Sequence, residues 1–533
     1  MREAAGVDRI SNLPDSLLHH IHSFLRIKDI ARTSVPSKRW NFIWTTVPIL
    51  EFANSLYNSI PTYPETQKFM DFVDGTLHRH DSSNIDKFSL HCNHHLNENR
   101  LHSWISTVIR ANVKEIDLFI RQKRRLFIPL SLFTCESLIS LKLLTYPNVR
   151  LPKYISFPRL KRLALICFGF SDESWNEELF SRSPVLEELI LLSCTYSTRN
   201  FCISIPTLKL LKIGTWHDEE NDLRNCVFKI DAPRLVSFSY WGYAAKEFVL
   251  SNFLVLVEAT VYFNSQNKVG AEATSQLLGA LAHVKCLTVH NETLKAICSA
   301  YDLSNYLPTF HNVKMLKISD SITTDEGLIA LLKGVPNLES LVFGQYMNDK
   351  MVEDSVGEVE NDSDEDDEND SDDAKGDGDN DNEDDAANSV EGEDNHHNKD
   401  EGAGDGDDDN EHDDAYFVEG ENNYHNEYEG DVADAAECES NDEYEDNSWA
   451  LDNATTGCLF PHLKSVCFQH FVGNPREMRW MKMILRNAKA LQMMTIRYHA
   501  PSFYLVNTKS EEKLMVEMPS FPRASADCMI NFC

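Results

Sequence analysis

A short apolar pattern repeats along most of this 533-residue chain. It has the form apolar-x-x-apolar-x-apolar, and it is clearest in the copies that begin at Leu138, Leu160, Leu186 and Leu208. Weaker copies begin at Ile85, Val113, Leu235, Leu256, Val284, Val313, Leu338, Leu463 and Leu491. Up to Leu338, consecutive copies start 21 to 29 residues apart. A unit this short cannot bury its apolar residues alone, so it must stack on copies of itself.

The pattern predicts one short strand in each repeated unit. Its last three positions alternate in the way that strand residues do. In six copies a proline lies two positions before the first apolar residue, at Pro158, Pro184, Pro206, Pro233, Pro336 and Pro461. We expect each proline at the start of its strand, because proline cannot donate a ladder hydrogen bond and would break a helix. The alternative, an array of leucine-rich helices, is therefore disfavoured.

Spacing and strand pattern together are typical of leucine-rich repeats, at the long and irregular end of their range. We therefore expect residues 80–350 to form an irregular leucine-rich-repeat solenoid. In such a solenoid the residues that flank the inward leucines line an exposed face. Ile190, Leu192 and Trp241 hold such positions and would offer an apolar anchor to a protein substrate, unless loops cover them.

An acidic tract interrupts the repeats. Residues 352–447 hold 43 Asp and Glu residues against two lysines, and such a composition predicts disorder. Outside the tract, 48 Lys and Arg residues face 41 Asp and Glu residues, so the net charge of −34 belongs to the tract alone. Without its 96 residues, the 125-residue interval from Leu338 to Leu463 shrinks to 29, a normal repeat spacing here. We therefore predict an insertion between two adjacent repeats.

The N-terminal residues 8–54 form a different unit, with three predicted short helices. Asn12 would cap the first helix, with Pro14 and Asp15 in its first turn. Asp29 would cap the second, and the third would run from Lys38 to Thr45. So small a unit cannot bury all of its apolar side chains, which indicates a docking surface. The alternative is a helical cap on the repeats.

This unit resembles the F-box, a module that attaches substrate receptors to cullin-based ubiquitin ligases. The resemblance rests on Leu13-Pro14, Leu17-Leu18 and the run from Ser37 to Trp40, whereas Pro36 and Arg26 depart from the usual pattern. It implies that the segment binds the Skp-family adaptor, and through it cullin and RING subunits. The residues expected to bind the adaptor are Leu13, Pro14, Leu17, Leu18, Ile21, Val35, Trp40 and Trp44.

Residues 458–533 contain a predicted strand from Leu463 to Phe468, a helix from Pro475 to Asn487 and a second strand from Leu491 to Tyr498. This order resembles the FBD domain that closes many plant F-box/leucine-rich-repeat proteins. Nearly all of the chain except the acidic tract is thus similar to that plant family. The expected fold is α/β, with a three-helix F-box, an irregular solenoid and an FBD-like C-terminal cap.

The family resemblance implies a non-catalytic substrate-recognition subunit of an SCF-type ubiquitin ligase. Two alternatives remain. One is a leucine-rich-repeat scaffold with a degenerate F-box, for which Pro36 is the feature to watch. The other is an acidic histone-binding chaperone that works through residues 352–447.

No motif for catalysis or cofactor binding is present, so we expect neither an enzyme nor a cofactor. The histidine clusters at residues 19–22 and 91–95 lack a convincing metal-site pattern, and the thirteen cysteines form no Cys-x-x-Cys pair. The basic run Arg121–Arg125 is expected to be a solvated loop and no specific nucleic-acid site. The most apolar run, Phe248–Val257, is too short to span a membrane, and no signal peptide is visible. We expect the protein in the cytoplasm, the nucleus or both.

Overall fold

The computed structural model describes most of the chain outside the acidic tract. The described residues are 13–22, 25, 27–33, 44–54, 63–81, 85–93, 95–122, 126–171, 179–215, 223–251, 253–263, 271–299, 307–319, 325–344, 459–498 and 511–533. They belong to one compact unit, residues 1–357 with 450–533. The predicted tract at 352–447 lies outside the described residues.

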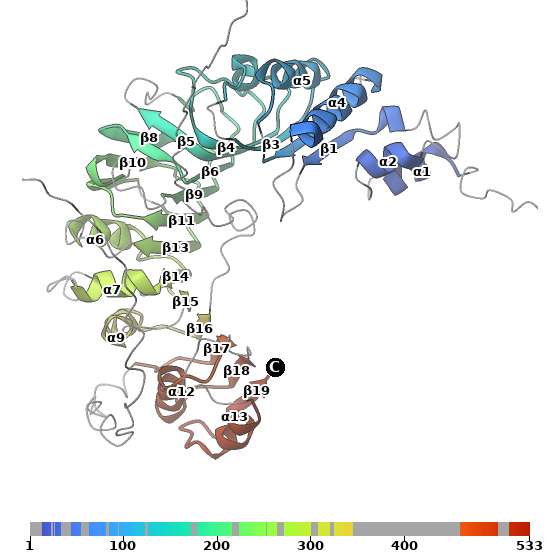
Figure 1. The fold of residues 1–533 in the computed structure, drawn as a ribbon. Helices are drawn as coiled ribbons and strands as arrows, with labels where there is room; N and C mark the ends of the chain where they lie inside the picture. Colours follow the sequence, from blue (N-terminus) through green and yellow to red (C-terminus); the bar gives the residue numbers. More distant parts are fainter. Residues whose placement is uncertain are drawn as a thin grey trace, which may run out of the picture. The chain divides into compact units, whose positions relative to one another are not determined.

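A 16-stranded sheet organises this unit, and its neighbouring strands pair in parallel (Figure 1). Fifteen strands follow one another across the sheet and β7 pairs only with β5. The strands of the sheet are β1 (Ile49–Asn54), β2 (Lys87–Cys92), β3 (Glu115–Arg121), β4 (Ser140–Arg150), β5 (Arg162–Ser171), β6 (Glu188–Leu192), β7 (Thr195–Ser197), β9 (Leu210–Gly214), β11 (Ser237–Gly242), β13 (Glu258–Phe263), β14 (Cys286–His290), β15 (Met315–Ser319), β16 (Ser340–Gly344), β17 (Ser465–Phe471), β18 (Met493–Tyr498) and β19 (Met529–Phe532). The predicted solenoid is thereby confirmed, with one parallel strand for each repeat.

The return segments between the strands differ along the chain. In the central repeats they include three strands of a second parallel sheet, β8 (Asn200–Ser204), β10 (Val227–Asp231) and β12 (Glu247–Leu250). Elsewhere they are helices: α4 (Tyr63–Arg79), α5 (Glu98–Arg110), α6 (Ala271–Ala280), α7 (Asn291–Ser299), α9 (Asp325–Lys333), α12 (Pro475–Asn487) and α13 (Glu511–Glu517). Short 3₁₀ helices are η2 (Leu130–Thr134), η3 (Leu223–Asn225) and η4 (Met518–Ser520). Figure 1 shows α6, α7 and α9 together on one side of the strands.

The prolines of the repeat begin turns and not strands. In the copy at Leu186, the backbone N–H of Leu186 donates to the carbonyl of Ser183 at 3.2 Å, which places Pro184 second in a four-residue turn. The same bond joins Leu208 to Ile205 at 3.1 Å. The fixed φ of proline suits this position. The strand begins only at Glu188, four residues after Pro184. The prediction that each proline stands at the start of its strand was therefore wrong.

The core lies between the sheet and its return segments. The motif leucine that precedes each strand is buried, and so are the alternate strand residues, such as Leu189 and Leu191 in β6. Aromatic rings fill the space beneath the central repeats, where Phe201 lies 5.1 Å from Phe170 and 5.6 Å from Phe228 between ring centroids. Each repeat therefore covers the apolar side chains of its neighbours.

The N-terminal unit includes α1 (Asp15–His22), α2 (Ile27–Thr33) and the 3₁₀ helix η1 (Trp44–Thr46). Helix α1 begins where the Pro14 carbonyl accepts the N–H groups of Leu17 and Leu18, at 3.0 and 3.1 Å. Helix α2 begins two residues before Asp29, so Asp29 is not its cap; its carboxylate pairs with Arg32 at 3.1 Å instead. Most of the predicted third helix lies outside the described residues.

The C-terminal residues continue the sheet. Strand β17 pairs with β16, and β18 pairs with β17, in the same parallel register as the earlier repeats. Between them α12 spans the predicted range, Pro475–Asn487. Asn474 and Glu477 form a reciprocal capping box at its start, and Pro475 occupies the first turn. These local signals explain why the helix could be predicted to the residue.

The strands on either side of the acidic tract are neighbours, with Ser340 opposite Ser465. Deleting residues 352–447 should therefore leave the sheet intact. The deletion leaves 24 residues between Gly344 and Ser465, close to the 20 between β15 and β16. A shorter loop costs less entropy to close, so we expect a gain of about 1 kcal/mol in the free energy of unfolding. Thermal melts of both chains, followed by circular dichroism, test this; an aggregated or unfolded deletion chain would contradict it.

Two ion pairs link the repeats of β15, β16 and β17. The Glu339 carboxylate accepts from Lys314 at 2.6 Å and from Lys464 at 2.7 Å. These hydrogen bonds lower the pKa of Glu339 to about 2, from 4.5. A lowered pKa in the folded state stabilises the fold above pH 4.5, and the effect is lost as the pH falls toward 2. Glu339→Gln should therefore lower the melting temperature slightly at pH 7 and leave it unchanged near pH 2.

Candidate binding surfaces

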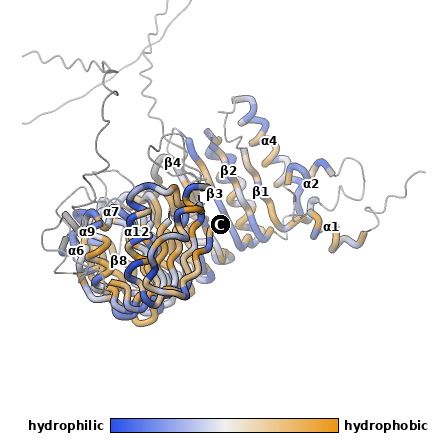
Figure 2. The backbone as a smooth tube through the Cα atoms, turned by 90° about the horizontal axis from the view of Figure 1, so that it is seen from below, coloured by the Kyte–Doolittle hydropathy of each residue, from blue (hydrophilic) through white to orange (hydrophobic). Residues whose placement is uncertain are grey.

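Helix α1 presents apolar side chains to solvent. Leu17 and Ile21, one helical turn apart, are 48% and 37% exposed. Leu25, just after the helix, is 40% exposed. Figure 2 shows hydrophobic and hydrophilic stretches side by side along this helix. Exposed apolar groups clustered on so short an element are typical of a docking surface.

The predicted adaptor residues fall into three groups. Pro14, Leu17 and Ile21 are exposed, as an adaptor contact requires. Leu18 and Trp44 are buried, and Leu13 packs against Leu18; their contact with the adaptor stays a prediction. A helix has an inner and an outer face, and Leu18 falls on the inner one. Val35 and Trp40 lie outside the described residues.

The end of the N-terminal unit is joined to the repeats by backbone hydrogen bonds. The Pro48 carbonyl accepts from Asp86 at 2.8 Å and from Lys87 at 3.1 Å, and β1 then pairs with β2. The His80 ring Nε2 lies 2.8 Å from the Val47 carbonyl oxygen. Burial lowers the pKa of His80, which favours the neutral ring. The segment therefore runs into the sheet without a loose linker at this junction.

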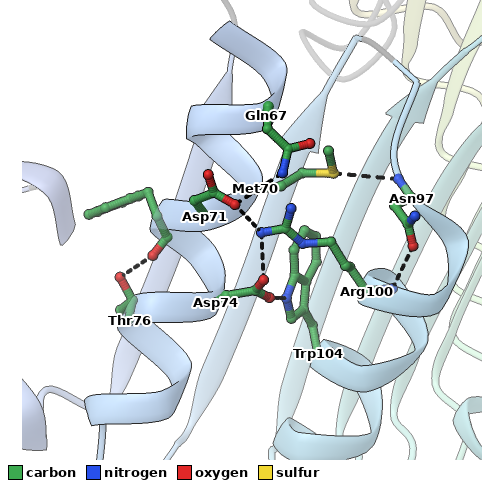
Figure 3. Close-up of polar contacts among 9 residues, drawn as sticks. Gln67, Met70, Asp71, Asp74, Thr76, Asn97, Arg100 and Trp104 are labelled. Carbon is green, nitrogen blue, oxygen red and sulfur yellow. Dashed lines mark hydrogen bonds and ion pairs between the residues drawn. The ribbon is translucent and has the colours of Figure 1, made fainter. Parts of the chain in front are cut away.

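A polar network beside this junction fixes α4 against α5 (Figure 3). Arg100 of α5 binds Asp71 of α4 at 2.7 Å, and it also pairs with Asp74. The indole N–H of Trp104 donates to Asp74 as well. Asn97 caps α5 by accepting from the Arg100 backbone at 3.2 Å. Trp104 is buried, so its bond to Asp74 is shielded from water. The network therefore fixes the spacing between α4 and α5.

The sheet has a second face, opposite the core, which we call the exposed sheet face. Pairing brings its residues into rows that cross the strands. The lysine row joins one residue from each strand between β4 and β15: Lys142, Ala164, Ile190, Lys212, Ser239, Thr260, Thr288 and Lys317. The apolar row lies two positions further along the strands: Phe119, Leu144, Ile166, Leu192, Gly214, Trp241 and Tyr262.

The predicted substrate residues come together on this face. Leu144, Ile166 and Leu192 form a buried cluster, and Ile190 and Trp241 pack against it while staying partly exposed. Leu192 itself is only 7% exposed, which corrects the expectation that it is open to a ligand. Gly214 explains this, because a Cβ there would lie 2.9 Å from Leu192 Cδ2 and 3.6 Å from Trp241 Cε3. The side chains of Leu192 and Trp241 therefore occupy the space that a side chain at position 214 would fill.

The described residues of the second histidine cluster and of the basic run make contacts with neighbouring strands. His91 pairs with Asp117 at 3.5 Å, and the Arg121 guanidinium lies 5.8 Å from the Tyr146 ring centroid. The rest of the run 121–125, apart from Gln122, lies outside the described residues, as do the side chains of His19, His22 and His94. Within the described ranges, no three His, Cys, Asp or Glu side chains gather closely enough to hold a metal ion.

Two further findings concern the described part of the chain. None of its helices is both long and apolar enough to cross a lipid bilayer. The ten cysteines whose side chains are described are free thiols, and among these ten only Cys533 is exposed. Burial raises the pKa of Cys167 to about 11, which keeps this thiol protonated and unreactive.

The fold and the two surfaces define a leucine-rich-repeat protein with an N-terminal helical docking module. Comparisons with known families give the same result. Residues 10–52 match the F-box domain, residues 101–251 match the leucine-rich repeats of the FBD-associated F-box protein At5g56370, and residues 455–496 match FBD.

Three relatives from Arabidopsis thaliana illustrate the similarity. The F-box/LRR-repeat protein At3g59190 is 30% identical over 64% of this chain and 94% of its own length. F-box/LRR-repeat protein 13 is 32% identical over 63% of this chain and 76% of its own length. The putative F-box/FBD/LRR-repeat protein At3g59240 is 31% identical over 63% of this chain and 68% of its own length. The chain belongs to the plant F-box/LRR-repeat/FBD protein family.

Membership has general consequences. The F-box implies binding to a Skp-family adaptor, and the family as a whole suggests a substrate-receptor role in SCF-type ubiquitin ligases. Proteins of this family are generally non-catalytic adaptors.

Proposed function

We propose that this chain is a non-catalytic substrate-recognition subunit of an SCF-type E3 ubiquitin ligase. Residues 8–54 bind the Skp-family adaptor and through it the cullin and RING subunits. Residues 80–350 hold a protein substrate, and residues 458–533 close the solenoid. The observation that carries the proposal is the exposed apolar surface of α1, Leu17 and Ile21, in a segment that matches the F-box model.

The exposed residues of α1 make the adaptor contact. Burying Leu17 and Ile21 against another protein would stabilise a complex by about 1–2 kcal/mol for each side chain. The buried Leu18 and Trp44, and Leu13, which packs against Leu18, belong to the same proposed adaptor surface. Val35 and Trp40 contribute from the segment between α2 and η1.

The substrate is held on the exposed sheet face. Ile190 and Trp241 form the apolar anchor, and they pack against the buried Leu192. The chain supplies no chemistry. It raises the effective concentration of substrate lysines near the ubiquitin-charged enzyme. Such a receptor works in the cytoplasm, the nucleus or both.

Affinity purification from plant cells with the proteasome blocked tests this function. The unchanged chain should retain the Skp-family adaptor and cullin, and its substrates should accumulate. Replacing Leu13 and Pro14 with alanine should remove adaptor and cullin while the repeats stay folded. A chain that never retains the adaptor would instead support the scaffold alternative, and retention of histones that depends on residues 352–447 would support the chaperone alternative.

A further inference from the structure

The excess positive charge outside the acidic tract is concentrated in one short stretch. Outside residues 352–447, the Lys and Arg residues exceed the Asp and Glu residues by seven. Residues 459–498 alone hold seven Lys and Arg residues against one acid, Glu477, so almost the whole excess lies there. This stretch is also the first described part of the chain after the tract. The most acidic and the most basic parts of the chain are therefore neighbours in the sequence.

Five of these cations form a stripe on α12 and just beyond its end, which we call the basic stripe. They follow one another at intervals of three or four residues, so they share one side of the helix. The buried side, with Met481 and Ile484, lies opposite. The members of the basic stripe are Arg476, Arg479, Lys482, Arg486 and Lys489.

The nearby acidic residues act only at the start of the stripe. Asp325 of α9 pairs with Arg476 at 3.6 Å and with Arg479 at 3.5 Å, so one carboxylate serves two guanidinium groups. The Glu477 carboxylate is turned toward the start of the helix, where it accepts from the backbone N–H groups of residues 472–474 at 2.9 to 3.2 Å. Neither acid reaches the second half of α12.

The second half of the stripe has no anionic partner in the described part of the chain. Lys482, Arg486 and Lys489 form no ion pair with any described residue. This holds even though residues 518–528 pack beside α12 and have Glu517 and Asp527 at their ends. The Lys482 ammonium group lies 5.1 Å from the centroid of a neighbouring aromatic ring, and Arg486 and Lys489 are exposed. Three cations within about two turns therefore form an uncompensated site for an anionic segment.

The acidic tract is attached to the chain next to this helix. The Phe343 ring of β16 lies 6.2 Å from the Trp480 ring of α12 between ring centroids. Gly344 follows directly, and residue 352 comes eight positions later. Eight residues span at most about 28 Å, and a 13-residue helix such as α12 is about 20 Å long. The tether therefore allows the tract to reach the whole basic stripe.

We propose that residues 352–447 bind in cis to the basic stripe and there compete with other anionic ligands. Carboxylates of the tract pair with Lys482, Arg486 and Lys489. The occupant is the chain's own segment, because attachment beside the site gives it an effective concentration on the order of 1 mM, an advantage that a free anion lacks. Because charge supplies the attraction, the contact weakens as salt rises. This inference goes beyond the proposed receptor function and does not depend on it.

Carbodiimide coupling of the full chain tests the contact. The reagent joins a lysine amine to a carboxylate that touches it, and mass spectrometry of the digested chain identifies both residues. Lys482 and Lys489 should be linked to residues 352–447 at least about ten-fold more often than Lys246 and Lys285, which are exposed elsewhere. The preference should disappear at about 1 M NaCl. In a mixture of isotope-labelled and unlabelled chains, the links should lie within one chain.

Competition is measured with a labelled peptide that has the sequence of residues 361–373. It should bind the chain that lacks residues 352–447 at least about ten-fold more tightly than it binds the full chain, because the stripe is then open. The change Lys482→Gln/Arg486→Gln/Lys489→Gln in the deletion chain should remove this gain. Glutamine removes the charges without placing acids at the C-terminal end of α12, and circular dichroism checks that the fold is kept.

The matched control is Arg159→Gln/Lys246→Gln/Lys285→Gln, which removes the same number of charges at exposed positions outside the basic stripe. In the deletion chain it should leave peptide binding unchanged. A docked tract also stabilises the folded full chain at low salt. The gain in stability on deleting residues 352–447 should therefore be larger at about 1 M NaCl than at about 50 mM NaCl.

Several results would overturn the inference. One is crosslinks spread evenly over the exposed lysines, and another is equal peptide binding by the full and the deletion chain. Links between a labelled and an unlabelled chain would assign the stripe to the tract of a second copy. Tight binding of a labelled oligothymidylate to the full chain, lost in the triple glutamine variant, would show that the stripe is open to nucleic acid. Adaptor binding is measured on the same preparations, so a failure of the proposed function shows separately.

Discussion

Replacing Leu17 and Ile21 together with aspartate is expected to reduce adaptor binding by about 100-fold or more. Both side chains are exposed and lie on one face of α1, so a partner that covers them would have to bury two carboxylates. The fold itself should barely change, because exposed positions tolerate substitution within about 0.5 kcal/mol. Titration of purified adaptor into each chain measures the loss.

The control for this variant is Leu254→Asp. Leu254 is 74% exposed, just before β13, and it belongs to neither proposed surface. Adaptor binding to this variant should equal that of the unchanged chain. If Leu17→Asp/Ile21→Asp binds equally well too, the contact surface has been assigned to the wrong face of α1.

The second large effect is expected at Asp325, the first residue of α9. Its carboxylate is buried, with 5% of the side chain exposed, and accepts a 2.7 Å hydrogen bond from the Trp480 indole of α12. Arg476 and Arg479 pair with it at 3.6 and 3.5 Å. Asp325→Ala would leave the buried Trp480 indole N–H without this acceptor, and it would remove one ion pair from each of the two arginines. We expect a loss of about 2–4 kcal/mol in the free energy of unfolding, allowing for the partial exposure of both arginines.

Denaturant unfolding, with hydrogen exchange of α12 as a local readout, measures this loss. Asp325→Asn keeps an acceptor for Trp480 and loses only the charge, so its cost should be smaller. Asp29→Ala removes an exposed ion pair on α2 and should cost less than about 1 kcal/mol. Equal stability of Asp325→Ala and Asp29→Ala would mean that the α9–α12 contact contributes little.

The strands and their order could be predicted because the repeat imposes both. The first motif leucine fixes where each strand starts: Leu186 precedes Glu188 of β6, and Leu491 precedes Met493 of β18, by two residues. Helix α12 was predictable because its capping residues are local in the sequence. Such signals depend on neighbours along the chain and need no knowledge of tertiary contacts.

Side-chain exposure was harder to predict. Alternation places Leu192 correctly on the face opposite the core, but it cannot show that Gly214 on the next strand leaves room for Leu192 and Trp241 to meet. The same limit applies to Leu18, whose position on the inner side of α1 depends on tertiary packing. The second sheet of β8, β10 and β12 was missed because its strands lie in return segments that carry no repeat motif.

Calorimetric titration of the purified full chain with a purified Skp-family adaptor tests the central claim most directly. A saturable one-to-one complex, lost in Leu17→Asp/Ile21→Asp and kept in Leu254→Asp, is the predicted result. Absence of saturable binding by the correctly folded chain would contradict its assignment as a ubiquitin-ligase receptor.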